Sequence, residues 1–550
     1  MNIEAAHARS TGVSAPFGLN ISGGVGAARP IVWSIAGSDS GGGAGLQADV
    51  KAFAAFGVHG CTAVAAITAQ NSVAVTRMEA VNAELLDAQL AALAHDMLPQ
   101  AIKTGLLGSV ENVRVVCRWV DQLRTAARAK GQTVALVVDP VLGATTGAGF
   151  ADDALVQAYV KELLPRATLV TPNRNEALRL LAAAQHGHDE DTGVEAMART
   201  LSACASPPLA VVITGGDASA QDGTANDWLS SPQASGWLSL PRVDTAHQHG
   251  TGCTFASTAA AALASGYCVA DAVVLAKMAT THALRYGYAA GEGAGPVCVQ
   301  ADFAQQLSNL PALSPVVAAV TSPAFRPLRD PALGVYAVVD SAAWVRRVLA
   351  AGIRTVQLRI KDPQEPTLEA QIRESIALTN ATPGAQLFIN DHWALALRLG
   401  AYGVHLGQED LDAVDLAALR QAGVRLGLST HSYWEVARAW GLRPSYIACG
   451  PVFATQSKDM PWIPQGLDNL RYWAALLPVP VVGIAGIDVR NIAEVAAQGV
   501  ASAAVITAIT RAADPEAACH QLTMEFARGQ GLPREGLPMR ARSTLHSRIE

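Results

Sequence analysis

Several features that mark specialised classes of protein are absent from this chain. Its eight cysteines include no CxxC pair, and no apolar run approaches the roughly 18 residues that a membrane-spanning helix needs. Only 16% of the residues are charged and the net charge is -6, so there is no basic surplus to attract a nucleic acid. These absences argue against a disulfide framework, a membrane span and a nucleic-acid partner. The scattered thiols predict a reducing cytoplasm.

The start of the chain lacks the apolar core of a signal peptide. Residues 1–29 are rich in Gly, Ala and Ser and include Glu4, so we expect a flexible tail there. At the other end, Arg, Pro and Gly rise and the apolar periodicity fades from about residue 529. This change predicts a second flexible tail over residues 529–550.

A proline-rich seam divides the rest of the sequence. Prolines 311, 315, 323, 327 and 331 crowd one weakly periodic stretch. Proline removes a backbone donor and blocks the continuation of a helix, so residues 306–332 are predicted to be a linker. Half of the 550 residues are hydrophobic, which is enough for two cores. We therefore expect two large domains, over residues 30–305 and 333–528.

Strand-like and helix-like segments alternate in the first domain. An amphipathic helix is predicted over residues 46–56. The strand candidates are residues 31–36, 58–68, 101–104, 133–139, 168–171 and 209–214. This alternation is typical of an α/β domain with a mostly parallel sheet.

The second domain alternates more regularly. Its strand candidates are residues 334–339, 355–358, 386–389, 403–405, 425–428, 446–449, 479–482 and 501–505. Eight such strands, each followed by a helix-like stretch within about 200 residues, fit a compact (β/α)8 barrel. The helix phases alone leave an open sheet as the alternative.

Polar residues follow the strands of the predicted barrel at the point where each strand ends. Arg359, Lys361 and Lys458 are cations that suit a pyrophosphate. Asp391 and Asp410 are carboxylates that could share Mg²⁺. Taken singly, such residues are often helix caps or solvated edges. Their recurrence at the ends of seven strands favours a site, because barrel chemistry lies at the carboxyl ends of the strands.

These motifs together resemble those of thiamine-phosphate synthase. The resemblance covers about residues 333–525 and includes QLRIK at 357–361, FIND at 388–391, GVHLGQED at 403–410, GLSTH at 427–431 and GPVFATQSK at 450–458. It implies the joining of hydroxymethylpyrimidine diphosphate to a thiazole phosphate, with release of pyrophosphate. Ala485 departs from the family, which often has glycine there.

The resemblance also implies a role for each matching residue. The pyrimidine diphosphate would be held by Gln357, Leu358, Arg359, Ile360, Lys361, Asn390, Ser429 and the catalytic Lys458. The thiazole phosphate would be held by Thr455, Gln456, Ser457, Gly486, Ile506 and Thr507. Asp391 and Asp410 would bind Mg²⁺.

In the first domain, the sequence HGTGC at 249–253 precedes a long helix-like run. Glycines at a helix start let backbone amides surround an anion, and the helix start lowers the pKa of a cysteine. Cys253 is therefore a candidate base, with a buried structural cysteine as the alternative. Asn173 and Glu176 could organise the metal and phosphates of a nucleotide, but a helix cap explains them equally well. No GxxxxGKS/T loop occurs, which points away from P-loop kinases.

The first domain resembles hydroxymethylpyrimidine/phosphomethylpyrimidine kinase, a ribokinase-like family with a three-layer α/β/α fold. The motifs are AGSDSGGGAG at 36–45, QADVK at 47–51, AQN at 69–71, IKTG at 102–105, VDPV at 138–141, TPNRNE at 171–176 and HGTGC at 249–253. The resemblance implies two successive phosphorylations by ATP with Mg²⁺. Gln70 would bind the aminopyrimidine, Cys253 would take the hydroxyl proton, Asn173 and Glu176 would serve Mg–ATP, and the anion hole would be Gly250, Thr251, Gly252 and Cys253.

Two positions depart from this kinase family. Thr214 stands where a lysine is common, and Leu106 stands where a methionine is common. A pyridoxal kinase is the rival assignment for this domain, although that relative usually has aspartate at the position of Cys253. A non-catalytic ligand-binding barrel is the rival for the second domain.

The expected partners are small molecules: the pyrimidine alcohol and its phosphates, the thiazole phosphate and ATP. Since ribokinase-like relatives often dimerise, the resemblance further implies a homodimer through the kinase domain.

Overall fold

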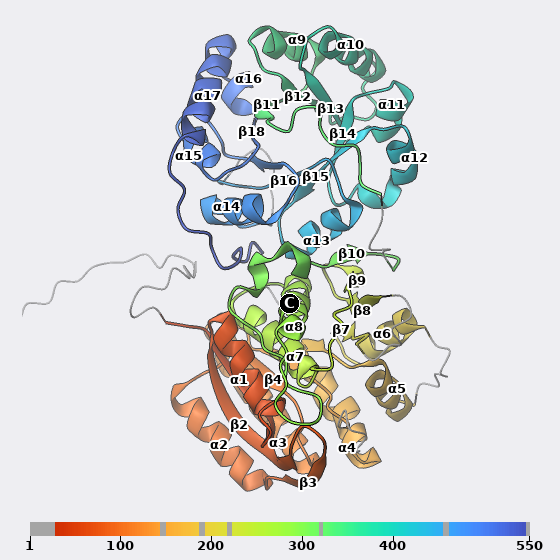
Figure 1. The fold of residues 1–550 in the computed structure, drawn as a ribbon, viewed down its shortest axis with the longest axis vertical. Helices are drawn as coiled ribbons and strands as arrows, with labels where there is room; N and C mark the ends of the chain where they lie inside the picture. The colour runs from red at the N-terminus through yellow and green to blue at the C-terminus, as the bar shows by residue number, and fades with distance from the viewer. Residues whose placement is uncertain are drawn as a thin grey trace, which may run out of the picture.

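The structure is a computed structural model that describes residues 28–143, 150–185, 193–216, 223–317, 323–454 and 461–545. Two domains are stacked along the long axis of the molecule (Figure 1). The tail predicted over residues 1–29 lies outside the described residues except for its last two positions.

The N-terminal domain is built on one ten-stranded sheet in the order β10-β9-β8-β7-β6-β5-β4-β1-β2-β3. Its strands are β1 (Ile31–Asp39), β2 (His59–Gln70), β3 (Val75–Ala80), β4 (Ala101–Thr104), β5 (Ala135–Val138), β6 (Leu169–Val170), β7 (Ala210–Ile213), β8 (Thr224–Ser230), β9 (Ser235–Pro241) and β10 (Ala312–Ser314). The predicted strands form the parallel centre of the sheet. The sequence did not predict β3, β8, β9 and β10, which pair antiparallel toward the two edges.

Helices cover both faces of this sheet. They are α1 (Gly45–Phe56), α2 (Ala83–Asp96), α3 (Val110–Arg128), α4 (Asp153–Ala158), α5 (Arg174–Ala183), α6 (Val194–Ser202), α7 (Thr251–Ala264) and α8 (Val269–Arg285). Successive residues of a strand point to opposite faces of the sheet and so belong to separate cores. Val32 lies in the core formed with α1, α7 and α8, whereas Trp33 lies in the core formed with α2 to α6. This confirms the predicted three-layer α/β/α fold.

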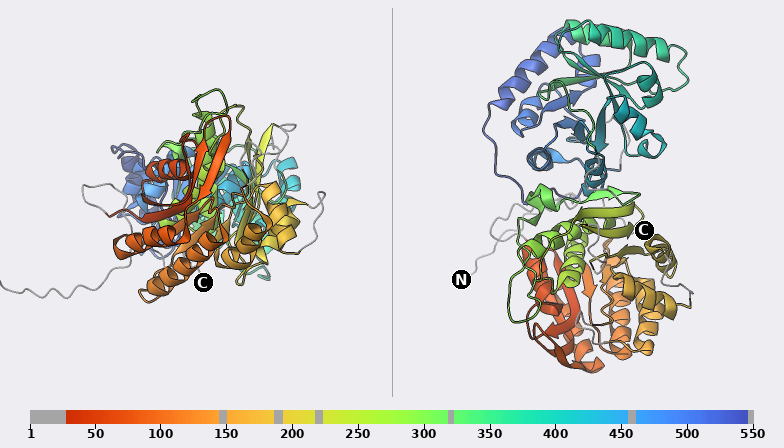
Figure 2. Two further views of the ribbon diagram at one scale, coloured as in Figure 1. Left: turned by 90° about the horizontal axis from the view of Figure 1, so that it is seen from below. Right: turned by 45° about the vertical axis from the view of Figure 1, so that its right-hand side comes forward.

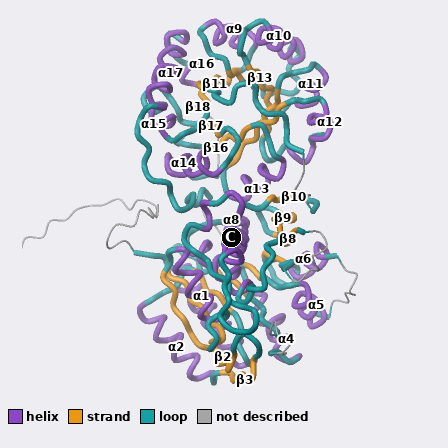
Figure 3. The backbone as a smooth tube through the Cα atoms, viewed as in Figure 1, coloured by secondary structure: helices purple, strands orange, loops and turns teal. Residues whose placement is uncertain are grey.

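The C-terminal domain is a closed barrel of eight parallel strands (Figure 3). The strands are β11 (Gly334–Val339), β12 (Thr355–Leu358), β13 (Gln386–Asn390), β14 (Gly403–Leu406), β15 (Arg425–Thr430), β16 (Tyr446–Cys449), β17 (Val481–Ile484) and β18 (Ser502–Val505). The helices are α9 (Ala342–Ala350), α10 (Leu368–Asn380), α11 (Trp393–Arg398), α12 (Leu416–Gln421), α13 (Tyr433–Leu442), α14 (Gly466–Leu476), α15 (Ile492–Ala497), α16 (Thr507–Thr510) and α17 (Pro515–Gln530). Pairing of β11 with β18 closes the ring, so the predicted (β/α)8 barrel is confirmed and the open sheet is excluded.

Within the described residues, parts of the predicted linker over residues 306–332 pack against the domains, whereas other parts are exposed. Strand β10 pairs with β9, which makes residues 312–314 part of the first sheet. Phe325 is 3% exposed, and its backbone N–H donates to the carbonyl of Arg443 in the barrel. Proline ends regular secondary structure here, but apolar residues between the prolines are still buried in the hydrophobic cores of the domains.

The predicted flexible tail over residues 529–550 is packed in part, within the described residues, which end at 545. Helix α17 continues to Gln530, and the following segment runs back from the barrel to the junction between the domains (Figures 1 and 2). Ala541 and Thr544 there are only 1% and 2% exposed. Weak periodicity concealed this packing, because an extended segment can bury single residues without any helical or strand pattern.

Candidate active sites

Two glycine motifs that lie far apart in the sequence touch in the N-terminal domain. Gly250 has a φ of 88°, and a Cβ added to it would lie 2.0 Å from the carbonyl oxygen of Gly43. Only glycine allows both this left-handed conformation and this close approach. The contact places the loop after β1 against the start of α7, and so brings the two predicted anion-binding motifs together.

Asp39 organises the loop between β1 and α1. Its carboxylate accepts hydrogen bonds from the backbone N–H groups of Gly41, Gly43 and Ala44, at 2.8–2.9 Å. The Nε2 atom of His249 lies 3.0 Å from the same carboxylate. Burial alone would raise the pKa of Asp39, but the hydrogen bonds from His249 and the loop hold that pKa below its ordinary value.

The predicted pyrimidine-binding residue belongs to this cluster. The side-chain nitrogen of Gln70, at the end of β2, lies 3.2 Å from Nε2 of His249. The chain Gln70–His249–Asp39 therefore joins the predicted substrate amide to the loop carboxylate. Sequence reasoning assigned no role to Asp39 or His249, although both stand inside the glycine motifs.

Cys253 lies in the first turn of α7, where the backbone N–H groups have no partner within the helix. Gly250, Thr251 and Gly252 precede it, and a Cβ on Gly252 would meet open space. The helix start was expected to lower the pKa of Cys253. Instead, burial raises that pKa to about 12, despite the nearby charge of Lys103. The resting group is a thiol, because desolvation outweighs the helix start.

Beneath Cys253 lies a buried charge network that the sequence did not reveal. Nζ of Lys103 lies 3.0 Å from Oδ1 of Asp49 and 3.4 Å from Oδ2 of Asp139. Ser257, one turn after Cys253, donates to Asp49 at 2.7 Å. Burial alone would lower the pKa of Lys103, but the neighbouring carboxylates raise it, so the ammonium stays charged.

Asp139 is the acceptor in this network. The Cys253 thiol lies near its carboxylate, so that each group influences the pKa of the other. Its buried Oδ2 atom accepts no hydrogen bond of good geometry within the described part of the chain. Burial raises the pKa of Asp139 while Lys103 opposes the shift. Asp139 is therefore a candidate acceptor for a proton from the nearby thiol.

Asn173 and Glu176 form a capping box at the start of α5. Each side chain accepts a hydrogen bond from the other residue's backbone N–H, at 2.9 Å in both cases. The structure thus bears out the capping explanation, and a nucleotide role stays a prediction. Thr214 follows β7 and lies beside Asn173 through an isolated backbone bridge.

In the barrel, the predicted charged residues gather at the carboxyl ends of β12 to β14. Asp391 follows β13 with a φ of 61°. Burial and the charge of Asp410 raise the pKa of Asp391, whereas Lys361 and Arg359 lower it. These four groups therefore share one electrostatic environment, as a diphosphate site with a metal requires.

Asp391 and Asp410 fit a magnesium ion. Both supply hard carboxylate oxygens, and a divalent cation would relieve the repulsion that Asp391 experiences. The backbone N–H of Gly407 donates to Oδ2 of Asp410 at 2.8 Å, which fixes that side chain. Among the described residues, no group of three or more His, Cys, Asp or Glu side chains could hold a metal. Substrate phosphate oxygens would complete the shell.

The remaining predicted residues of the diphosphate site rest on a buried polar chain inside the barrel. Gln357 donates to the Tyr336 hydroxyl at 3.2 Å, and that hydroxyl lies 2.9 Å from the hydroxyl of Tyr446. Nδ1 of His405 lies 2.7 Å from the Tyr446 hydroxyl, and its Nε2 lies 2.9 Å from Oγ of Ser429. The sequence did not point to either tyrosine, because a tyrosine within a strand is usually an ordinary residue of the hydrophobic core.

His405 is neutral in this chain. Burial lowers its pKa to about 4, and the nearby positive charge of Arg359 acts in the same direction. Asn390, at the end of β13, is 6% exposed, and Leu358 and Ile360 are buried at 1% and 8%. These two apolar residues therefore support the site through packing and backbone rather than through polar side chains.

The predicted thiazole-phosphate loop follows β17. Gly486 has a φ of 70°, and a Cβ there would lie 2.6 Å from Cβ of Phe453. Ala485 also has a positive φ, 78°, which explains why glycine suits that position. Ile506 and Thr507 lie at the start of α16, after β18. Thr455, Gln456, Ser457 and Lys458 lie outside the described residues.

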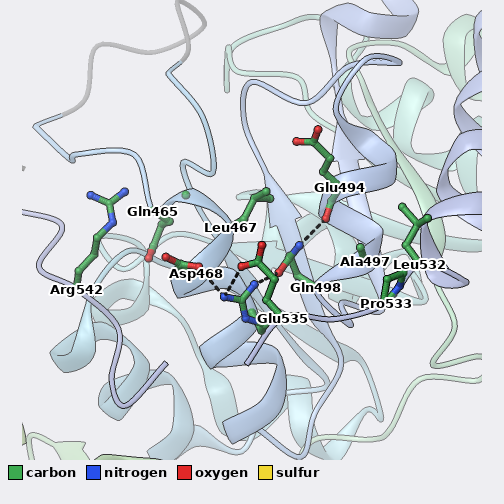
Figure 4. Close-up of a pocket in the computed structure, with 12 residues that line it drawn as sticks. Gln465, Leu467, Asp468, Glu494, Ala497, Gln498, Leu532, Pro533, Glu535 and Arg542 are labelled. Atoms are coloured by element: carbon green, nitrogen blue, oxygen red, sulfur yellow. Dashed lines mark hydrogen bonds and ion pairs between the residues drawn. The ribbon is translucent and has the colours of Figure 1, made fainter. Parts of the chain in front are cut away.

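One cavity is lined by residues of two barrel helices and of the segment that follows α17. It has a volume of about 720 Å³ and opens on the outer wall of the barrel, between α14, α15 and residues 532–542 (Figure 4). Arg471 lines it and pairs with Asp468 and Glu535, at 2.6 and 3.3 Å. None of the predicted site residues lines this cavity, so we assign it no part in the chemistry. Within the described ranges, no helix is long and apolar enough to cross a membrane.

Comparison with known proteins identifies both domains. The family model for phosphomethylpyrimidine kinase matches residues 39–298, and that for thiamine monophosphate synthase matches residues 335–509. The chain is 54% identical over 191 residues to a thiamine-phosphate synthase of Serratia proteamaculans, which covers 34% of this chain and 90% of the relative. The structure is similar to the pyridoxal kinase from Staphylococcus aureus in complex with ADP, with 30% identity, a TM-score of 0.43 and coverage of 49% of this chain and 93% of that one.

One relative spans both domains. A protein of Oryza sativa described as a probable thiamine biosynthetic bifunctional enzyme, chloroplastic, is 34% identical over 480 residues, covering 84% of this chain and 83% of the relative. The resemblances to both families are thereby confirmed. The chain belongs to the bifunctional thiamine biosynthetic enzymes, with a phosphomethylpyrimidine kinase domain followed by a thiamine-phosphate synthase barrel.

Proposed function

We propose that the chain carries out three consecutive steps. Hydroxymethylpyrimidine is phosphorylated by ATP to its monophosphate and then to its diphosphate, over residues 30–305. The barrel over residues 333–528 joins the diphosphate to a thiazole phosphate and releases pyrophosphate. The observation that carries this proposal is the charge at the barrel's strand ends: two carboxylates and two cations share one environment, as a departing pyrophosphate with a metal requires.

The kinase site supports transfer to a neutral alcohol through a proton relay. As the hydroxyl oxygen attacks the γ-phosphorus of ATP, the bond from phosphorus to ADP breaks. The hydroxyl proton passes to Sγ of Cys253, and the thiol proton passes to the Asp139 carboxylate. The N–H groups of Gly252 and Cys253, in the first turn of α7, would stabilise the charge on the transferred group. This relay explains how a protonated thiol can act as a base.

The second phosphorylation makes a different demand. Its acceptor is already an ionised phosphate, so no hydroxyl proton has to leave. Gly250, Thr251 and Gly252 would then matter through backbone donors alone. Asn173 and Glu176 are proposed to serve the Mg–ATP end in addition to capping α5.

In the barrel, Asp391 and Asp410 would hold Mg²⁺, which would neutralise the leaving pyrophosphate. Arg359, Lys361 and Lys458 add positive charge, and the neutral His405 holds the Ser429 hydroxyl. Gln357, Asn390 and Ser429 would orient the pyrimidine diphosphate. Gly486 and the start of α16 would receive the thiazole phosphate, together with Thr455, Gln456 and Ser457. Departure of pyrophosphate needs such neutralisation more than a general base.

A coupled assay on the full chain tests the function. With hydroxymethylpyrimidine, ATP, Mg²⁺ and the thiazole phosphate, we expect thiamine phosphate, ADP and pyrophosphate. Leaving out the thiazole phosphate should stop the sequence at the pyrimidine diphosphate. Thiamine phosphate formed only from added pyrimidine diphosphate would disprove the kinase steps.

The structural likeness to a pyridoxal kinase makes pyridoxal the second substrate to test. Because Gln70 and Cys253 match the pyrimidine kinase motifs, we expect a lower kcat/KM for pyridoxal than for hydroxymethylpyrimidine. A higher value for pyridoxal would reverse the assignment.

Two further properties are proposed. All eight cysteines are free thiols, which supports a reducing compartment such as the cytoplasm. A homodimer through the kinase domain is supported by Ile67 and Val73, apolar side chains that are 58% and 55% exposed near the β2–β3 turn. Sedimentation of the full chain, compared with an Ile67→Lys variant, tests the dimer.

A further inference from the structure

The last described residues lie between the two domains and contact both. We call residues 538–545 the C-terminal strap. On its kinase side, the Tyr267 hydroxyl donates to the carbonyl of Ala541 at 2.5 Å, and the Ser543 hydroxyl donates to the carbonyl of Gly266 at 2.6 Å. The Arg540 guanidinium lies 4.0 Å from the ring centroid of Phe56. These contacts fasten the strap to α1 and to the turn between α7 and α8.

On its barrel side, the strap contacts two helices. The backbone N–H of Ala541 donates to the hydroxyl of Tyr433, at the start of α13, at 2.9 Å. Asn469 in α14 makes a pair of hydrogen bonds with the backbone of Arg542, at 2.7 and 3.0 Å. The strap is therefore held by directional contacts on both sides.

The end of the strap reaches the roots of two loops of the synthase site. The Thr544 hydroxyl donates to the carbonyl of His431 at 2.6 Å, and the backbone N–H of Ile463 donates to the carbonyl of Thr544 at 2.7 Å. His431 comes two residues after Ser429, at the end of β15. Ile463 comes five residues after Lys458, beyond β16.

The two loop roots also hold each other. The His431 ring stacks on Trp462 with centroids 4.7 Å apart and an angle of 5°. The Gln465 side chain donates to the carbonyls of His431 and Gly450, at 2.9 and 3.3 Å. Thr544 is thus one of several groups that link the two loop roots, beside the direct backbone bond from Gly450 to Thr430. It is the one that the strap links to the kinase domain.

We propose that Thr544 is a positioning residue for the synthase reaction and that the strap sets the roots of the β15 and β16 loops from the kinase domain. The inference rests on the proposed synthase function of the barrel. It implies that contacts made inside the kinase domain, such as that of Tyr267, influence how tightly the barrel holds the pyrimidine diphosphate.

The test compares variants of the full chain that differ by single atoms. Thr544→Val keeps the shape and removes the hydroxyl, whereas Thr544→Ser keeps the hydroxyl. Loss of one buried hydrogen bond of this kind corresponds to about a fivefold change in an equilibrium constant. We expect Thr544→Val to raise the KM for the pyrimidine diphosphate about fivefold, and Thr544→Ser to stay within about twofold of the unmodified chain. Both kinase rates should be unchanged in each variant.

Two further measurements separate positioning from general weakening. Tyr267→Phe should also raise the synthase KM without altering the kinase rates. Hydrogen–deuterium exchange should quicken at residues 461–466 in Thr544→Val and Tyr267→Phe. Thr523→Val is the matched control, because it removes a hydroxyl that donates to the carbonyl of Cys519 within α17, far from the strap. It should change neither KM nor exchange at 461–466.

Three outcomes would overturn the inference. They are an unchanged synthase KM in Thr544→Val, equal damage in Thr544→Val and Thr544→Ser, and unchanged exchange at residues 461–466. If the unmodified chain forms no thiamine phosphate, the proposed function fails instead. The exchange measurement then decides by itself whether the strap holds the two loop roots.

Discussion

The backbone N–H of Trp434 in the barrel donates a 2.9 Å hydrogen bond to Oδ1 of Asp271 in the kinase domain. One domain therefore caps a helix of the other, since Trp434 lies in the first turn of α13. Ser432, Cys268 and Glu435 are the other polar neighbours of this carboxylate. Burial, with a smaller contribution from Glu435, raises the pKa of Asp271 to about 7.

This raised pKa makes the junction sensitive to pH. Between the ordinary value of 3.8 and about 7, the folded protein binds more protons at Asp271 than the unfolded chain does. The contribution of Asp271 to stability must therefore fall as the pH rises through this window. Between pH 5 and pH 8, Asp271 should lower the unfolding free energy of the unmodified chain by up to about 2 kcal/mol. In Asp271→Asn this contribution should be absent, so its unfolding free energy should fall less over the same range.

Urea unfolding of both proteins at the two pH values measures this difference. Asp227→Asn, which alters another buried acid in the kinase domain, is a control away from the junction. A constant difference between Asp271→Asn and the unmodified chain at both pH values would contradict the assignment.

Replacing Ala485 with glycine should stabilise the barrel. Ala485 has a φ of 78°, a left-handed conformation that costs an alanine about 1 kcal/mol relative to glycine. We expect Ala485→Gly to raise the unfolding free energy by roughly 0.5–1 kcal/mol. Thermal denaturation checks this, with Ala497→Gly in α15 as a destabilising control. A lower melting temperature for Ala485→Gly would show that the loop is not strained.

The two kinase steps should respond differently to loss of the proton relay. Asp139→Asn leaves Lys103 paired with Asp49, so the domain should remain folded. We expect Asp139→Asn and Cys253→Ala to slow the first phosphorylation at least tenfold more than the second, because only the alcohol must lose a proton. Single-turnover rates with the alcohol and with its monophosphate measure this directly.

Thr104→Val controls for disturbance of the same buried layer, since the Thr104 carbonyl accepts from the Asp139 backbone. Equal losses in both steps for Cys253→Ala would assign that residue to the anion hole. If Cys253→Ala slows the first phosphorylation more than the second but Asp139→Asn slows both equally, Asp139 has no part in the relay and Cys253 keeps its role.

Lys458→Ala should lower synthase turnover by about 100-fold or more, because a cation that stabilises a leaving pyrophosphate in a dry site is worth several kcal/mol. Kinase rates and the melting temperature should not change. Steady-state release of pyrophosphate from added pyrimidine diphosphate is the measurement, and Lys361→Ala provides a comparison at an exposed cation. Near-normal turnover in a folded Lys458→Ala protein would refute the role.

The parallel strands were predictable because buried strands carry continuous apolar runs. Strands β4, β11, β12 and β16 have the bounds predicted from the sequence. Strands β3, β8 and β9 were missed, because they are more exposed and lack such runs. In the candidate sites, motif spacing located Gly250, Asp391 and Asp410. It did not reveal Tyr446 or Lys103, whose partners lie on other elements of the fold.

The sequence by itself determined the two domains, their fold classes and the chemistry expected at the strand ends, because periodicity and motif spacing are local properties of the chain. Only the tertiary structure decided that Gly43 touches Gly250, that burial keeps Cys253 protonated and that residues 538–545 join the domains. Each of these depends on which distant atoms exclude water from a group or come within hydrogen-bonding reach of it. No local pattern encodes that proximity.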